Sequence, residues 1–144
     1  MKVVFSDTFL TGHAEIDREH REMFELLDRL AQSASDGTAR RCGEHVNAFL
    51  EACRNHFRHE ESILSELKFP RLEAHRVFHT ELLKKGEAIT AICQEPCPPD
   101  VLETIVTDLV RFFLDDVVRA DTDFASFLQE HGVADPHPCA PSGV

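Results

Sequence analysis

Histidines and carboxylates recur at positions where predicted helices of this chain turn their apolar face inwards. The segment "NHFRHEESIL" carries His56 and Glu60, and the segment "HRVFH" begins with His75 and ends with His79. Residues four apart on a helix point the same way, about 40° apart around its axis. Each pair can therefore hold one cation between its two side chains.

Three further ionisable residues continue apolar stripes at helical spacing. His20 follows Ile16 by four residues, Asp116 follows Phe112 by four, and Asp121 follows Val117 by four. Four imidazoles and three carboxylates are thus expected to face one interior. The candidate metal ligands are His20, His56, Glu60, His75, His79, Asp116 and Asp121.

Each of these residues alone has a plain structural explanation, as a hydrogen-bonded core histidine or as a buried aspartate that caps a helix. Together they do not, because an unpaired buried charge costs several kcal/mol and no matching inward Lys or Arg is present. Imidazole and carboxylate without thiolate are typical of iron or manganese rather than zinc. Seven donors exceed the four of a usual zinc site, so we expect a carboxylate-bridged pair of metal ions.

The remaining histidines and one carboxylate fall beside or away from the stripes. We expect His59 and Glu61 to be solvated or to orient a ligand imidazole through a carboxylate. The other histidines are expected at the surface: His13, His45, His131 and His137.

Four amphipathic helices must position these side chains. The clusters "SASDGT", "KFP" and "QEPCPPD" break the chain. Asp100 with Glu103 resembles a capping box, and Gly86 is expected to let a neighbouring helix approach closely. The expected helices cover about 15–32, 38–66, 71–93 and 100–129. No period-two pattern indicates a strand, so the expected fold is all-α. It is an antiparallel up-down-up-down four-helix bundle with an N-terminal arm and a short C-terminal tail.

Composition restricts the class of protein. The 144 residues fit one domain, expected over 1–130, followed by a Pro-rich tail over 131–144. A net charge of −11 at pH 7 repels phosphate and anionic lipid, so neither nucleic acid nor a membrane is an expected partner. No apolar run approaches the roughly 20 residues of a membrane span, and no signal peptide is evident. We expect a cytoplasmic protein.

The five cysteines include no Cys-x-x-Cys pair, which indicates reduced thiols. Cys42 and Cys53 fall on apolar stripes and are expected in the core. Cys93, Cys97 and Cys139 lie near loops or in the tail, where a redox or metal role stays open.

The segments "GHAEIDREH", "HFRHEE" and "HRVFH", followed by a fourth helix that carries Asp121, give the chain a clear resemblance to the haemerythrins. It is most similar to single-domain bacterial haemerythrins, over about residues 9 to 129. The resemblance implies a non-haem di-iron centre with an oxo or hydroxo bridge that binds dioxygen at one iron. Manganese is the alternative metal.

The resemblance also implies how the ligands are shared. His20 and His56 would be terminal ligands of the iron with the open coordination position. His75 and His79 would bind the other iron. Two carboxylates, one from the second helix and one from the fourth, would bridge the pair: Glu60 and Asp121.

One position departs from the family pattern. Haemerythrins have a histidine five residues before the bridging aspartate, where this chain has Asp116, and Phe112 replaces the usual tryptophan. Because aspartate is shorter than histidine, Asp116 would ligate the second iron directly only if the helix shifts, and would otherwise act through a bound water or leave the position vacant. An anionic ligand stabilises ferric over ferrous iron. The diferrous state is therefore expected to oxidise faster here than in a reversible carrier.

The resemblance favours an oxygen-binding protein, a carrier, store or scavenger, rather than an enzyme. Asp116 favours an alternative, a di-iron redox enzyme or sensor that reacts with oxygen, peroxide or nitric oxide. Either needs an electron donor that the sequence does not identify. Iron storage or a purely structural metal bundle is a further alternative. No nucleophile elbow or phosphate-binding loop supports a hydrolase or nucleotide-binding protein.

Overall fold

The computed structural model describes residues 2–6, 9–35, 39–94 and 98–133, and within these it does not describe the side chains of 39–41 and 116–122. The elements are helical throughout: α1 (Ala14–Ser35), α2 (Ala39–Glu66), α3 (Leu72–Cys93), α4 (Pro99–Phe112), the π-helical turn η2 (Phe113–Val117) and α5 (Val118–Glu130). Among the described residues, none of the helices combines the length and apolar character that a membrane crossing requires.

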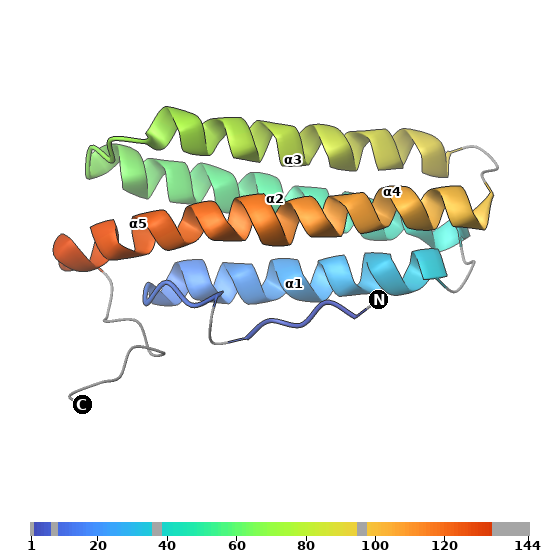
Figure 1. Ribbon diagram of the computed structural model, residues 1–144, viewed down its shortest axis with the longest axis horizontal. Coiled ribbons are helices and arrows are strands. Elements are labelled where there is room, and N and C mark those ends of the chain that lie inside the picture. The colour runs from blue at the N-terminus through green and yellow to red at the C-terminus, as the bar shows by residue number, and fades with distance from the viewer. Residues whose placement is uncertain (1, 7–8, 36–38, 95–97, 134–144) are drawn as a thin grey trace.

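The helices form an antiparallel bundle, as the sequence predicts. α4, η2 and α5 follow one another in a single rod, so the bundle has four rods (Figure 1). α1 packs against α2, α2 against α3, α3 against α4 and α4 against α1, which closes the ring. Because neighbouring rods are joined by short connections, each runs opposite to the next.

The fourth rod differs from the sequence prediction at two points. Its expected start, a capping box at Asp100 and Glu103, is wrong. Pro98 occupies the N-cap position without a side-chain cap, and Pro99 is the first helical residue. Proline suits that position, since its fixed φ is helical and its missing N–H has no partner there anyway. The π-helical turn η2, which interrupts the rod, was not expected.

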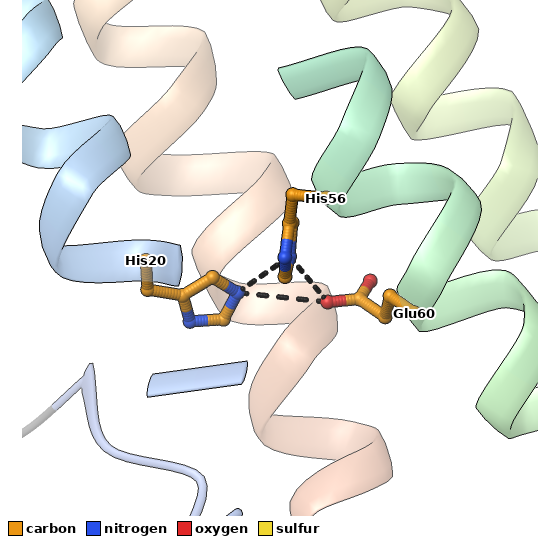
Figure 2. A group of neighbouring side chains, drawn as sticks. All are labelled: His20, His56 and Glu60. Carbon is orange, nitrogen blue, oxygen red and sulfur yellow. Dashed lines mark hydrogen bonds and ion pairs between the residues drawn. The ribbon is translucent and has the colours of Figure 1, made fainter. Parts of the chain in front are cut away.

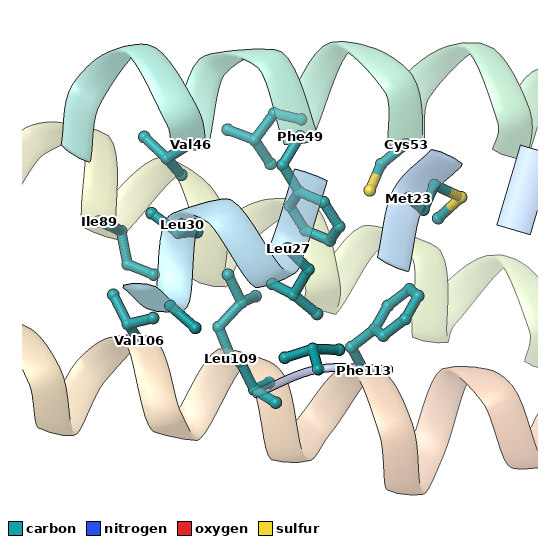
Figure 3. Close-up of a cluster of buried hydrophobic side chains, with 14 of the residues drawn as sticks. Met23, Leu27, Leu30, Val46, Phe49, Cys53, Ile89, Val106, Leu109 and Phe113 are labelled. Atoms are coloured by element: carbon teal, nitrogen blue, oxygen red, sulfur yellow. The ribbon is translucent and has the colours of Figure 1, made fainter. Parts of the chain in front are cut away.

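Two apolar clusters fill the bundle. The larger joins α1, α2, α3 and α4 around side chains such as Leu27 and Phe49 (Figure 3). It contains Cys42 and Cys53, both fully buried, which confirms the core prediction. The smaller cluster consists of Ile16, Leu64, Phe69, Phe124 and Leu128.

The polar candidates lie between the two apolar clusters. On α2, Phe57 belongs to the larger cluster and Leu64 to the smaller, and Glu60 lies between them in the sequence. On α1, His20 lies in the same way between Ile16 and Met23. The ionisable groups therefore form one buried polar layer with apolar side chains on both sides, which restricts the access of bulk water.

A close approach of α2 and α3 helps to bring their ligands together. Gly86 of α3 packs under Leu50 of α2, and a Cβ at Gly86 would overlap that leucine side chain. The prediction that Gly86 admits a neighbouring helix is confirmed.

Candidate metal centre

The buried polar layer contains two groups of metal-ligand atoms that share one residue. His20 comes from α1, His56 and Glu60 from α2, and His75 and His79 from α3. In each group the ligand atoms lie within 4.8 Å of one another, and Glu60 belongs to both groups. All five side chains are buried, and Glu60 is completely so.

The first group joins α1 to α2. Nε2 of His20 lies 2.9 Å from Nε2 of His56, and Oε2 of Glu60 lies 2.8 Å from the latter atom and 3.5 Å from the former. Figure 2 shows the three side chains converging on one point, with the other oxygen of Glu60 directed away from it.

The second group uses that other oxygen. Oε1 of Glu60 lies 2.5 Å from Nε2 of His75 and 3.1 Å from Nε2 of His79. Each carboxylate oxygen of Glu60 therefore faces a different pair of imidazoles. This is the arrangement by which one carboxylate bridges two cations.

Two atoms of the layer show that the side chains alone do not satisfy one another. Oε2 of Glu60 and Nε2 of His79 are buried and have no hydrogen-bond partner among the described residues. Both lie at hydrogen-bonding distance from a neighbour, but not in a suitable orientation. Buried polar atoms are nearly always paired, so two such atoms in one layer require an explanation. One cation in each group would give each of these atoms a partner, and the donor set therefore fits metal ions.

The charges of the layer are compatible with cation binding. Burial alone would raise the pKa of Glu60, but the imidazoles of His56, His20 and His75 outweigh it and hold that pKa well below its usual value. Burial lowers the pKa of His56 and His79, but nearby carboxylates more than offset this and raise both: Glu60 acts on each, with Glu19 on His56 and Glu61 on His79. Glu60 is thus held as a buried carboxylate anion, the form in which a carboxylate binds a metal ion.

Comparison with known families agrees with this geometry. The model described as the "Hemerythrin HHE cation binding domain" matches residues 11–128. The chain belongs to the haemerythrin family. The Bacteriohemerythrin of Stenotrophomonas maltophilia (strain R551-3) is 23% identical over 129 residues, which cover 90% of this chain and 83% of that protein.

Two Myohemerythrins are also similar to this haemerythrin. The one from Riftia pachyptila is 24% identical over 88 residues, 61% of this chain and 68% of the relative. The one from Theromyzon tessulatum is 21% identical over 91 residues, which cover 63% of this chain and 71% of the relative. The resemblance inferred from the motifs is therefore confirmed at the level of the family.

The outer nitrogen of His56 contacts a carboxylate that the sequence analysis missed. Nδ1 of His56 lies 2.8 Å from Oε1 of Glu19, which also approaches Nδ1 of His59 at 3.1 Å. Burial raises the pKa of Glu19, but these two imidazoles outweigh it and the net shift is downward. Glu19 immediately precedes His20 and falls off the apolar stripe. Its spacing alone therefore gave no signal that it reaches a ligand of another helix.

The outer nitrogen of His79 also contacts a carboxylate, in this case the predicted Glu61. Oε2 of Glu61 lies 2.8 Å from Nδ1 of His79, and Nε of Arg76 donates to its Oε1 at 3.0 Å. The hydrogen bond from His79 lowers the pKa of Glu61, against a smaller effect of burial, and Arg76 lowers it further. The expectation that Glu61 meets a candidate ligand agrees with this contact.

Two predicted ligands of this haemerythrin lie outside the described side chains. Asp116 belongs to the backbone of η2 and Asp121 to that of α5. Both residues stay predictions. The other histidines expected at the surface vary: His131 is exposed, His13 and His45 are partly buried, and His137 is outside the described residues, as is most of the predicted tail.

Proposed function

We propose that this haemerythrin domain holds two iron ions and binds dioxygen as a carrier, store or scavenger. The observation that carries the proposal is the position of Glu60. Its two oxygens face two separate pairs of histidines in a buried layer between two apolar clusters. A single buried carboxylate that serves two imidazole pairs is typical of a two-metal centre in a helix bundle.

The proposed ligands follow from this arrangement. One iron is held by His20 and His56, and the other by His75 and His79. Glu60 bridges the two, Asp121 of α5 is the proposed second bridge, and Asp116 of η2 is the proposed third terminal ligand of the second iron. These ligands come from all four rods of the bundle, so metal binding also stabilises the fold.

Iron fits the donor set, and manganese is the alternative. The two groups contain imidazole and carboxylate without thiolate, which suits iron or manganese. When bound, iron supplies electrons that can be shared reversibly with dioxygen. The protein side chains restrict bulk water through the two apolar clusters, and they fix the imidazoles through Glu19 and Glu61. The relatives named Bacteriohemerythrin and Myohemerythrin support this choice.

A second candidate function is favoured by Asp116. The haemerythrin pattern has a histidine where this chain has that aspartate, and the backbone there forms the π-helical turn η2. Such turns occur frequently at functional sites. A carboxylate-richer centre favours ferric iron, so this candidate is a redox enzyme or sensor that reacts with oxygen, peroxide or nitric oxide. It requires an external electron donor.

Metal analysis combined with optical spectroscopy tests the proposal. Protein purified from iron-replete cells is expected to contain two irons per chain, with an oxy spectrum that disappears when oxygen is removed. Glu60→Gln is expected to lose at least one iron, whereas Glu51→Gln, an exposed change on the same helix, retains both. One zinc per chain, or no metal, would overturn the di-iron proposal. Turnover with peroxide or nitric oxide in place of a reversible spectrum would favour the second candidate.

A further inference from the structure

Both ring nitrogens of His79 have defined surroundings. Nε2 faces Oε1 of Glu60 at 3.1 Å, and Nδ1 lies 2.8 Å from Oε2 of Glu61. A carboxylate oxygen only accepts, so Nδ1 of His79 carries the hydrogen and donates it to Glu61. Nε2, the buried atom that has no hydrogen-bond partner among the described residues, is then the ring nitrogen left for a metal ion. Glu61 thus selects the tautomer in which His79 can bind a metal.

Glu61 is itself held in place from its other side. Arg76 donates from Nε to Oε1 of Glu61 at 3.0 Å, and its Nη1 contacts Glu73. The two oxygens of Glu61 therefore have separate partners, the guanidinium of Arg76 and the imidazole of His79. A carboxylate fixed at both oxygens cannot rotate away from the imidazole without losing a charged hydrogen bond.

The other half of the centre is held differently. Glu19 receives the imidazoles of both His56 and His59, and His59 is partly exposed and also faces Glu15. No arginine contact of Glu19 appears among the described residues. Within the described part of the chain, a carboxylate that meets a ligand imidazole and is also fixed by an arginine is therefore found only on the His75/His79 half. We call this arrangement of Arg76 and Glu61 the clamp. This is the half whose third imidazole in the family pattern is replaced by Asp116.

We propose that Glu61, clamped by Arg76, is the positioning residue that sets metal affinity at the His75/His79 half and so decides whether the chain holds one metal or two. The inference rests on the two-metal function proposed above. With two imidazoles available instead of three, the loss of one correctly oriented imidazole removes a larger share of the ligands of this metal. Residues that orient a ligand typically change metal affinity by about 10- to 100-fold.

Variants of the clamp separate its two contacts. In Glu61→Gln the amide keeps one acceptor oxygen and gains an NH₂ group. That NH₂ group must lie opposite an N–H donor of either His79 or Arg76, so one of the two hydrogen bonds is lost. Arg76→Gln leaves Glu61 anionic but unfixed. Glu73→Gln is the matched control, since Glu73 contacts the same arginine but is exposed and meets no described histidine. Glu61→Asp tests whether a shorter carboxylate restores part of the effect.

Cobalt(II) titration of the metal-free chain, with a competing chelator and optical detection, measures the affinity for each bound cobalt ion. It involves no oxygen chemistry. The wild type is expected to bind two equivalents. Glu61→Gln is expected to weaken one of them by about 10- to 100-fold and leave the other unchanged. Arg76→Gln is expected to weaken the same equivalent by a smaller factor, Glu61→Asp to recover part of the loss, and Glu73→Gln to match the wild type.

Proton NMR of the cobalt-loaded protein supplies a second readout. The ligand N–H proton of one histidine is expected to exchange with solvent faster in Glu61→Gln than in the wild type. A purely structural role of Glu61 would instead lower the melting temperature of the metal-free chain.

The outcomes separate the inference from the function on which it rests. Two unchanged equivalents in Glu61→Gln, or an equal loss at both, would overturn the positioning role and leave the two-metal proposal intact. A wild type that binds fewer than two equivalents would overturn both.

Discussion

Leu50 of α2 packs directly over Gly86 of α3, so that the two helices meet without a side chain on the α3 side. Gly86→Ala would gain about 1 kcal/mol in helix propensity. The new Cβ would overlap Leu50, and overpacking of this kind typically costs about 1–3 kcal/mol. Leu50 is 2% exposed and has little room to move. We expect a net lower free energy of unfolding, measured by urea denaturation.

The chain offers a matched control for this change. A Cβ at Gly43 would meet only Cβ of Cys93, at an ordinary 3.8 Å. Gly43→Ala is therefore expected to gain about 0.5–1 kcal/mol, since only the propensity effect remains. Equal stabilisation by both alanines would contradict the packing interpretation of Gly86.

Asp17 ties the loop before α1 to the helix that carries His20. Its Oδ1 accepts from the backbone N–H and the hydroxyl of Thr11, both at 2.7 Å, and its Oδ2 accepts from the N–H of Gly12 at 3.0 Å. Asp17→Ala leaves these donors without an acceptor in a buried position, at a cost of about 1–3 kcal/mol.

We expect a lower melting temperature for Asp17→Ala. A smaller loss is expected for Thr11→Val, which removes the hydroxyl that donates to Asp17 and accepts from the N–H of His13, but keeps both backbone donors to Asp17. Asp28→Ala serves for comparison, because Asp28 accepts from Val3 in the less buried N-terminal arm. If Asp17→Ala lowered the melting temperature no more than Asp28→Ala does, burial would not govern the cost of losing these hydrogen bonds.

Metal removal is expected to destabilise the whole bundle. A ligand that binds only the folded chain adds about 2.7 kcal/mol when its concentration is 100 times its Kd. Chelation should therefore lower the melting temperature of the metal-loaded protein by several degrees, as measured by differential scanning calorimetry. In Glu60→Gln the same chelator is expected to produce a smaller shift, because the bridging oxygens are no longer equivalent anions. A chelator effect of equal size in both proteins would contradict a bridging role of Glu60.

The sequence predicted the five described ligand candidates because each lies on a regular helix. His56 with Glu60, and His75 with His79, follow the four-residue spacing directly. Glu19 was missed because its partner His56 is 37 positions away on another helix, a contact that periodicity does not encode. Glu61 was placed beside the ligands, but its clamp by Arg76 is also a contact between helices.

The fourth rod shows where local patterns fail. A π-helical turn adds one residue to a helix, and the apolar spacing on either side of η2 stays close to helical. Such a turn is therefore hard to distinguish from continuous α-helix in the sequence. The capping motif at Asp100 also failed, because Pro98 and Pro99 start the helix first.

Asp116→His restores the residue type of the haemerythrin pattern at η2. A neutral imidazole stabilises ferric iron less than a carboxylate does, so the diferrous centre should persist longer. We expect the oxygenated form of Asp116→His to autoxidise more slowly than that of the wild type in stopped-flow measurements. Asp115→His is the matched control, because Asp115 is the exposed neighbour on the same turn. If the oxy forms of the wild type and of Asp116→His had equal lifetimes, the aspartate would not tune the centre, and the redox-enzyme alternative would lose its support.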